Sequence, residues 1–127
     1  MVIRRDDAEH VELETYWVRD YGRSTDRSSS LSYCEVAPGG AHPKMRSPRS
    51  DRYFYIVSGA LRGQSDVQGT VELGPGDMWY VPKGEQWSYE NASGAPVVFV
   101  LCHTPPLDLE VEEFEDGGPP AQVSLRP

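Results

Sequence analysis

Several features that define other protein classes are scarce in this chain of 127 residues. It has only two cysteines, Cys34 and Cys102, which are too few for a disulfide framework and form no CxxC redox motif. No stretch approaches the ~20 consecutive apolar residues that a membrane-spanning helix needs, and the amino terminus has no apolar run typical of a signal peptide. We therefore expect a cytoplasmic protein whose cysteines are free thiols.

Basic residues are also scarce. The chain has 12 Lys and Arg against 20 Asp and Glu, for a net charge of −8. Binding to nucleic acid or to an anionic membrane needs concentrated positive charge, so we expect neither of them as a partner.

A helical hydrophobic period is missing from every window, whereas 12 glycines and 11 prolines punctuate short apolar runs. This pattern predicts one all-β domain of short strands joined by defined turns. We expect an N-terminal edge strand within residues 11–21 and a flexible loop up to residue 30, then a barrel over residues 31–106. Residues 107–127 are expected to form an acidic tail rich in proline and glycine, with ordered pairing ending at residues 117–120 and mobile residues beyond. Within the barrel we predict strands at residues 31–37, 53–57, 60–64, 70–73, 79–81, 86–89 and 96–102, with residues 44–52 as a loop and strand entrance.

The most informative stretch runs from Gly76 to Asn91. It reads Gly, five residues, Pro82, one residue, Gly84, two residues, Trp87, three residues and Asn91. Glycine and proline at these points predict two tight turns around a short apolar strand. This order resembles the second motif of the cupin family, in which the position of Trp87 usually holds a metal-binding histidine.

The two ends of a first cupin motif lie upstream, at residues 38–40 and 53–59. Between them, the family's usual His, His and Glu positions hold Met45, Ser47 and Arg52. The resemblance covers residues 31–106 and implies a double-stranded β-helix, or jelly-roll barrel, around a central pocket. None of the substituted side chains suits a divalent cation, so we expect neither a metal nor another cofactor.

The resemblance also implies that Met45, Ser47, Arg52 and Trp87 line the pocket. Arg52 would place a cation in a partly dry cavity, where an anionic ligand would stabilise it; an ion pair with Asp51, Asp77 or Glu85, or exposure at the rim, is the alternative. The nearby basic residues Lys44, Arg46 and Arg49 would focus an anion toward the barrel mouth, or would form a solvated loop. Trp87 and Tyr89 point to the same side of one strand and could stack on a planar ligand, or could fill the core.

We therefore hypothesise a metal-independent isomerase, cyclase or dehydratase (a lyase) that transfers protons on an anionic or carbonyl-containing small molecule. The predicted catalytic residues are Arg52, His42 and Tyr55, and the predicted substrate-binding residues are Met45, Ser47, Trp87 and Tyr89. Histidine titrates near neutral pH, which makes His42 a candidate acid or base, and His103 is expected at the rim.

Three alternatives stay open. The protein could be a noncatalytic ligand-binding or sensing protein. With or without catalysis we expect a homodimer, with the N-terminal edge strand as a contact. A purely structural subunit would have a pocket filled by its own side chains. A replacement metal site could also be assembled from His42, His103, Cys34, Cys102 and Asp51, which are residue types that bind metals.

Overall fold

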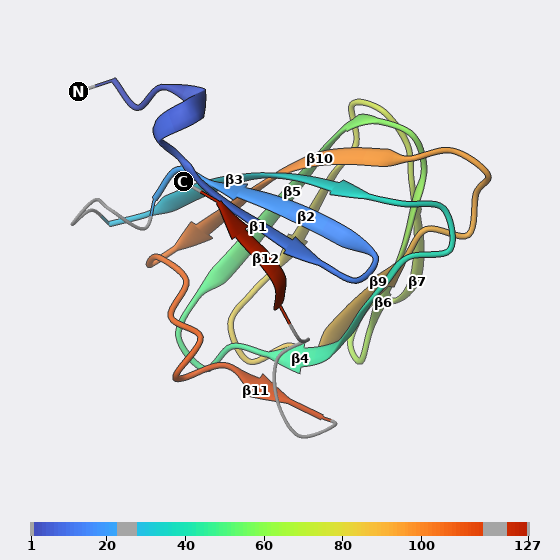
Figure 1. Ribbon diagram of the computed structural model, residues 1–127. Helices are drawn as coiled ribbons and strands as arrows, with labels where there is room; N and C mark the ends of the chain where they lie inside the picture. Colours follow the sequence, from blue (N-terminus) through green and yellow to red (C-terminus); the bar gives the residue numbers. More distant parts are fainter. Residues whose placement is uncertain (1, 23–27, 116–121, 127) are drawn as a thin grey trace.

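The chain folds into two antiparallel β-sheets that face each other, as the computed structural model in Figure 1 shows. The structure describes residues 2–22, 28–115 and 122–126. The large sheet has the order β12 (Gln122–Arg126), β1 (Glu9–Leu13), β2 (Tyr16–Asp20), β3 (Ser30–Val36), β10 (Val97–Thr104), β5 (Asp51–Ser58) and β8 (Met78–Val81). The small sheet has the order β11 (Glu113–Phe114), β4 (Ala41–Arg46), β9 (Trp87–Glu90), β6 (Leu61–Ser65) and β7 (Gly69–Leu73).

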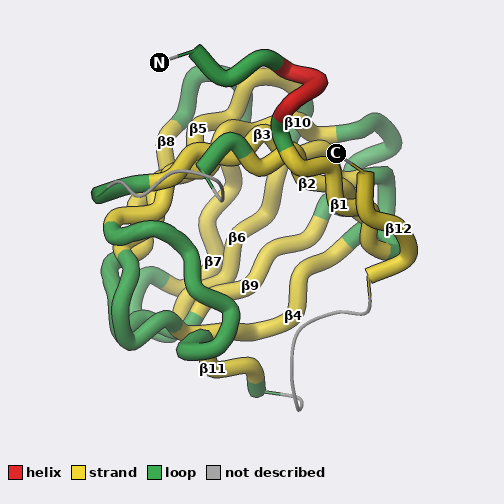
Figure 2. Tube along the Cα trace, turned by 60° about the vertical axis from the view of Figure 1, so that its left-hand side comes forward, coloured by secondary structure: helices red, strands yellow, loops and turns green. Residues whose placement is uncertain are grey.

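This arrangement confirms the predicted all-β jelly roll. One short 3₁₀ turn, Arg5–Asp7, is the single helical element in the described residues, and no helix there is long and apolar enough to cross a membrane. Figure 2 shows the strands of the small sheet lying opposite those of the large sheet.

Alternation along β5 decides which side chains point between the two sheets. Phe54 and Ile56 are fully buried between the sheets. Tyr53 and Tyr55, which alternate with them along the strand, lie on the outer face of the large sheet. Successive side chains of a strand point to opposite faces, so an inward Phe54 requires an outward Tyr55. Strand β10 lies in the interior of the large sheet, because it pairs with β3 on one side and with β5 on the other. Its buried side chains belong to the core.

The turns of the predicted motif have the conformations that their residues require. Gly76 and Gly84 both have φ of +87°, a region that side chains other than glycine rarely adopt. Asn91 is completely buried, and its amide donates to the carbonyls of Val36 at 3.1 Å and Ala95 at 2.8 Å. The motif is therefore a set of structural turns that hold β8 and β9 in place.

Three predictions about the flanking segments are wrong. Residues 11–21 form parts of two strands, and β1 is no edge, because β12 pairs with it on one side and β2 on the other. Residues 41–46 are strand β4, whereas residues 44–52 were expected to be a loop and strand entrance. Ordered pairing does not end at residues 117–120, which themselves lie outside the described residues, because β12 follows them. Most of the predicted flexible loop, residues 23–27, also lies outside the described residues.

The two outer faces differ in chemistry. On the large sheet, Tyr53 and Tyr80 stack across β5 and β8 with ring centroids 4.9 Å apart, and the next pair along is Tyr55 and Met78; all four side chains are exposed. On the small sheet, Arg62 instead makes ion pairs with carboxylates. The β5 and β8 part of the large sheet thus presents an uncharged aromatic surface to the outside.

Candidate functional site

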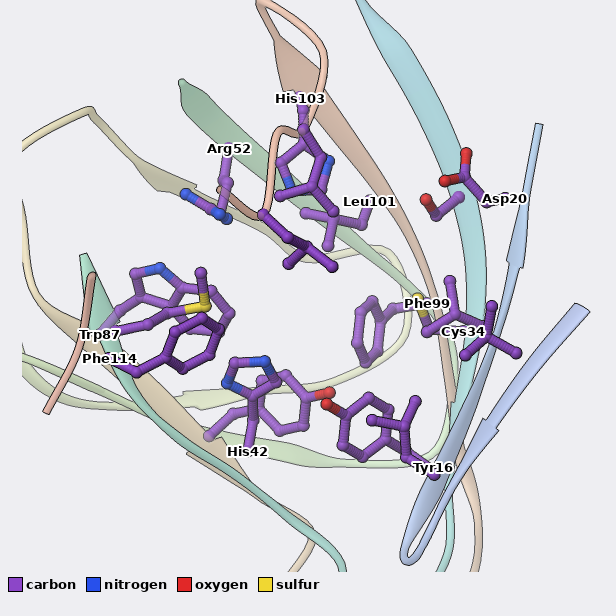
Figure 3. Close-up of a pocket in the computed structure, with 18 residues that line it drawn as sticks. Tyr16, Asp20, Cys34, His42, Arg52, Trp87, Phe99, Leu101, His103 and Phe114 are labelled. Carbon is purple, nitrogen blue, oxygen red and sulfur yellow. The ribbon is translucent and has the colours of Figure 1, made fainter. Parts of the chain in front are cut away.

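A cavity of about 240 Å³ lies between the sheets, which is the liquid volume of about eight water molecules. Figure 3 shows the residues that line it. Most of the wall is apolar, with contributions from β1, β2 and β10 of the large sheet and from β4 and β9 of the small sheet. The polar side chains of the lining are Tyr16, Asp20, Ser32, His42, Arg52, Tyr89 and His103. A space of this size and character suits one small organic molecule.

One wall of the cavity is a row of flat rings. His42 on β4 stacks on Trp87 of β9, with centroids 4.7 Å apart and an interplanar angle of 20°. The ring centroid of Trp87 is in turn 6.0 Å from that of Tyr89, with an interplanar angle of 23°. This geometry agrees with the predicted stacking wall, and it provides a surface for a planar ligand.

His42 is held in one tautomer. Its Nδ1 lies 2.8 Å from the carbonyl oxygen of Pro43, which can only accept a hydrogen bond, so Nδ1 carries the hydrogen and Nε2 keeps the lone pair. Burial lowers the pKa of His42 to about 4, opposed by the hydrogen bond to Pro43 and reinforced by the charge of Arg52. At neutral pH this imidazole is therefore an unprotonated base facing the cavity.

Two tyrosine rings flank His42. The ring centroid of Tyr16 lies 5.6 Å from that of His42, and the ring of Tyr89 lies 5.2 Å away. Burial raises the pKa of both hydroxyls, and their mutual interaction raises that of Tyr89 further. Both side chains stay protonated, and neither hydroxyl has a hydrogen-bond partner among the described residues. They are available as donors to a ligand.

Arg52 is buried, with only 2% of its surface exposed, and it is already paired. Its guanidinium donates to Glu112 at 3.0 Å and lies 5.2 Å from the centre of the Trp87 ring. Burial raises the pKa of Glu112 against the opposing charge of Arg52. The alternative considered from the sequence, an internal ion pair, is right in kind, but the carboxylate comes from Glu112 and not from Asp51, Asp77 or Glu85.

Glu112 belongs to the acidic segment, which we define as residues 107–115. This segment closes one side of the barrel through two further ion pairs, Arg49 with Asp108 at 3.2 Å and Lys44 with Glu115 at 3.7 Å. Its apolar residues Leu107, Leu109 and Phe114 line the cavity. Three of the four residues in the predicted basic cluster are thus paired with carboxylates, so the cluster does not serve as a free funnel for anions.

Two predicted site residues lie away from the cavity. Tyr55 is 49% exposed on the outer face of β5, so the expectation that it faces the pocket is wrong. Ser47 is buried in a turn, where its Oγ accepts the backbone N–H groups of Ser50 at 2.8 Å and Arg49 at 3.2 Å. The structure brings the other five together, because Arg52, His42, Met45, Trp87 and Tyr89 all line the cavity.

Sequence reasoning did not place four polar residues of the lining in the cavity: Tyr16, Asp20, Ser32 and His103. His103, expected at the rim, is only 3% exposed and pairs across the strands with Arg52 (Figure 3). Burial, with a further contribution from Arg52, lowers the pKa of His103 to about 3. The strict alternation of β10, with Phe99, Leu101 and His103 inward, was the available signal for this residue.

The donor set does not fit the metal that cupin sequences usually imply. The four corresponding positions hold Met45, Ser47, Arg52 and Trp87, and in the described part of the chain no three His, Cys, Asp or Glu side chains gather closely enough to hold an ion. The replacement site considered from the sequence is therefore not assembled. Both cysteines are free.

Comparison with known proteins gives a consistent result. Residues 32–103 match the family model of the cupin domain. No curated protein matches the sequence. Among solved structures, Streptomyces Pac13, a nucleoside dehydratase, superposes with a TM-score of 0.77 at 18% identity over 98% of each chain, and a variant of Pac13 was solved with uridine.

Two other similar structures have different contexts. KdgF from Halomonas sp. has a TM-score of 0.73 at 14% identity, covering 85% of this chain and 96% of its own. The cupin domain of Schizosaccharomyces pombe Cnp3 has a TM-score of 0.66 at 19% identity, covering 75% and 69%. At these identities the likeness is one of fold.

Proposed function

Since this chain belongs to the cupin family, we propose that its central cavity is a metal-independent active site, in which a small carbonyl-containing molecule loses water by proton transfer. The observation that carries the proposal is the grouping of His42, Tyr16 and Tyr89 in the cavity. A neutral imidazole is a proton acceptor, and two protonated phenols beside it can stabilise developing negative charge on an oxygen.

The reaction balances with these three side chains. Nε2 of His42 removes a proton from the carbon next to the carbonyl, and the electron pair moves onto the carbonyl oxygen, which accepts hydrogen bonds from Tyr16 and Tyr89. When the carbonyl re-forms, the bond from the next carbon to its hydroxyl breaks. The leaving oxygen takes the proton from the imidazolium of His42, which releases water and restores the neutral base.

The charge of the site favours a carbonyl compound over an anion. Arg52 was expected to hold an anionic oxygen, but its charge is balanced by Glu112 at 3.0 Å. In this proposal burial is the main reason that His42 stays unprotonated, and Arg52 adds to it because its positive charge lowers the pKa of that imidazole further.

The comparison with Pac13 supports the choice of a dehydration on a nucleoside-like molecule, because the two chains cover each other almost completely. A nucleoside has a flat ring that could stack on the wall of His42 and Trp87. Isomerisation and cyclisation begin with the same deprotonation, so they are the nearest alternatives to dehydration. A ligand-binding protein without catalysis would use the stacking wall but not the base.

The test uses deuterium exchange, which reports the first step whatever follows it. Nucleosides that carry a carbonyl with a hydroxyl on the second carbon from it are incubated with the protein in heavy water, and mass spectrometry follows deuterium uptake and loss of water. We expect H42Q to abolish both signals and Y16F to reduce them. H10Q and Y55F, on the outer face of the large sheet, are the matched controls and should retain activity. Binding without exchange in the unmodified protein would refute catalysis and leave the noncatalytic alternative.

We also propose a homodimer, with a contact other than the N-terminal strand expected from the sequence. The aromatic surface on β5 and β8 is uncharged in a chain with a net charge of −8. Exposed apolar patches of this kind mark interaction sites, and a second copy would cover it with the same surface by two-fold symmetry.

A further inference from the structure

A second imidazole faces the cavity from the opposite sheet. His42 projects from β4 of the small sheet and His103 from β10 of the large sheet, so the two rings lie on opposite sides of the same space (Figure 3). His103 is only 3% exposed, and it follows Phe99 and Leu101 on the inward face of β10. The proton transfer described above uses His42 alone, which leaves His103 without a role.

The surroundings of the His103 ring determine where its hydrogen lies. Nδ1 is fully buried and has no hydrogen-bond partner among the described residues. A hydrogen on Nδ1 would therefore be a buried donor without an acceptor, and such donors are rarer in proteins than unpaired acceptors. The hydrogen is therefore on Nε2, the ring nitrogen of this cavity-lining residue that is not buried in this way.

His103 is also an uncharged ring at neutral pH. Burial, together with the positive charge of Arg52 on the neighbouring strand, lowers the pKa of His103 to about 3. A neutral imidazole with its hydrogen on the nitrogen that faces a ligand can donate a hydrogen bond to an oxygen without giving up the proton. The two histidines thus present opposite groups to the cavity, because Nε2 of His42 offers a lone pair and Nε2 of His103 offers a hydrogen.

We propose that Nε2 of His103 donates a hydrogen bond to the hydroxyl that leaves the substrate, which makes His103 a second catalytic residue. The inference rests on the proposed function, in which the carbonyl oxygen is held by Tyr16 and Tyr89 beside His42. The departing oxygen gains negative charge as its bond to carbon breaks, and a donor aimed at that oxygen lowers the energy of the step. His103 keeps its hydrogen, because losing it would leave an imidazole anion. The proton that completes the water molecule still comes from the imidazolium of His42.

The two steps of the reaction separate this role from that of His42. The exchange assay described above, with the same nucleosides in heavy water, reports proton removal as deuterium uptake and the second step as loss of water. We expect H103L, which removes the donor, to slow loss of water about 100- to 1,000-fold and to leave deuterium uptake within about tenfold of the unmodified protein. H103Q, whose amide restores an N–H donor, should recover part of the lost rate. C102S, at the next position of β10 on its outer face, is the matched control.

Nuclear magnetic resonance tests the position of the hydrogen without any substrate. The chain has three histidines, so protein labelled with ¹⁵N in histidine gives three side-chain patterns, which H42Q and H103Q assign. At pH 7 we expect the hydrogen on Nε2 of His103 and on Nδ1 of His42. A hydrogen on Nδ1 of His103, or a doubly protonated His103 ring at pH 7, would overturn the inference even if H103L fails to fold.

The outcomes distinguish this inference from the proposed function. Equal losses of deuterium uptake and of water elimination in H103L, or no loss of either, would overturn the role of His103 and leave that of His42 intact. Exchange without loss of water in the unmodified protein would refute dehydration, and this role with it, but would leave isomerisation. Absence of both signals in the unmodified protein would refute the proposed function and the role of His103 together.

Discussion

Acidification should destabilise this protein well before its carboxylates are neutralised, because two imidazoles are buried without charge. The pKa of His42 is about 4 and that of His103 about 3 in the folded chain, against about 6.5 in the unfolded chain. Below pH 6.5 the unfolded state therefore binds more protons than the folded state. By linkage, the free energy of unfolding falls as the pH falls, and it continues to fall until the folded pKa values are reached.

The size of the effect follows from the pH interval. From pH 6.5 to pH 5 each histidine lowers the free energy of unfolding by about 2 kcal/mol, because one pKa unit corresponds to about 1.4 kcal/mol. The two histidines together lower it by about 4 kcal/mol. A domain of this size is stabilised by about 5–15 kcal/mol. Glu112 acts in the opposite direction, because its raised pKa lets the folded state take up a proton first.

Urea denaturation followed by tryptophan fluorescence at pH 7, 6 and 5 measures the effect. H42Q and H103Q should each remove about half of the pH dependence, and E112Q should steepen it by removing the opposing contribution. A free energy of unfolding that is constant between pH 7 and 5 would refute the reasoning. So would a pH dependence that is as large in both histidine variants as in the unmodified protein.

Four further outcomes are expected. Replacing Glu112 by Ala should cost about 3–5 kcal/mol in urea denaturation because it strands the buried charge of Arg52, and a double change of both residues to apolar ones should recover much of it; equal losses in the two would argue against the pair. If His42 is the base, kcat/KM should be flat near neutral pH and fall as the pH drops through about 4, whereas a decline centred near 6.5 would show an ordinary, solvated imidazole. Light scattering should find a dimer that Y55E converts to a monomer, and a monomeric unmodified protein would exclude the proposed contact. Elemental analysis by inductively coupled plasma mass spectrometry should find far less than one metal ion per chain, with unchanged activity after chelation; stoichiometric metal would contradict the donor set.

The motif residues made the barrel predictable because they act locally. Gly76, Gly84 and Asn91 determine turns through their own backbone angles and hydrogen bonds, so their spacing was sufficient to place β8 and β9. Positions aligned with the family motifs also brought Arg52 and Trp87 to the cavity. Tyr55 shows where this fails, because a shift of one residue along a strand exchanges the inner face for the outer.

The rest of the site depends on contacts between segments distant in sequence. Tyr16 and Asp20 reach the cavity only because β2 pairs with β3 in a particular register, and no local pattern specifies that register. Glu112 meets Arg52 across 60 positions of the chain. An isolated carboxylate in an acidic stretch gives no sign of its partner, so the ion pair could not be predicted.

Eight of the 18 residues that line the cavity lie outside the region that matches the family. Tyr16 and Asp20 precede residues 32–103, and the acidic segment that closes the barrel follows them. The matched region thus supplies the barrel, and we expect the segments before residue 32 and after residue 103 to influence which molecule the cavity binds. Exchanging these two flanking segments between cupins of this size would be expected to change ligand preference while the barrel stays folded. Family membership alone is therefore a poor guide to what such proteins bind.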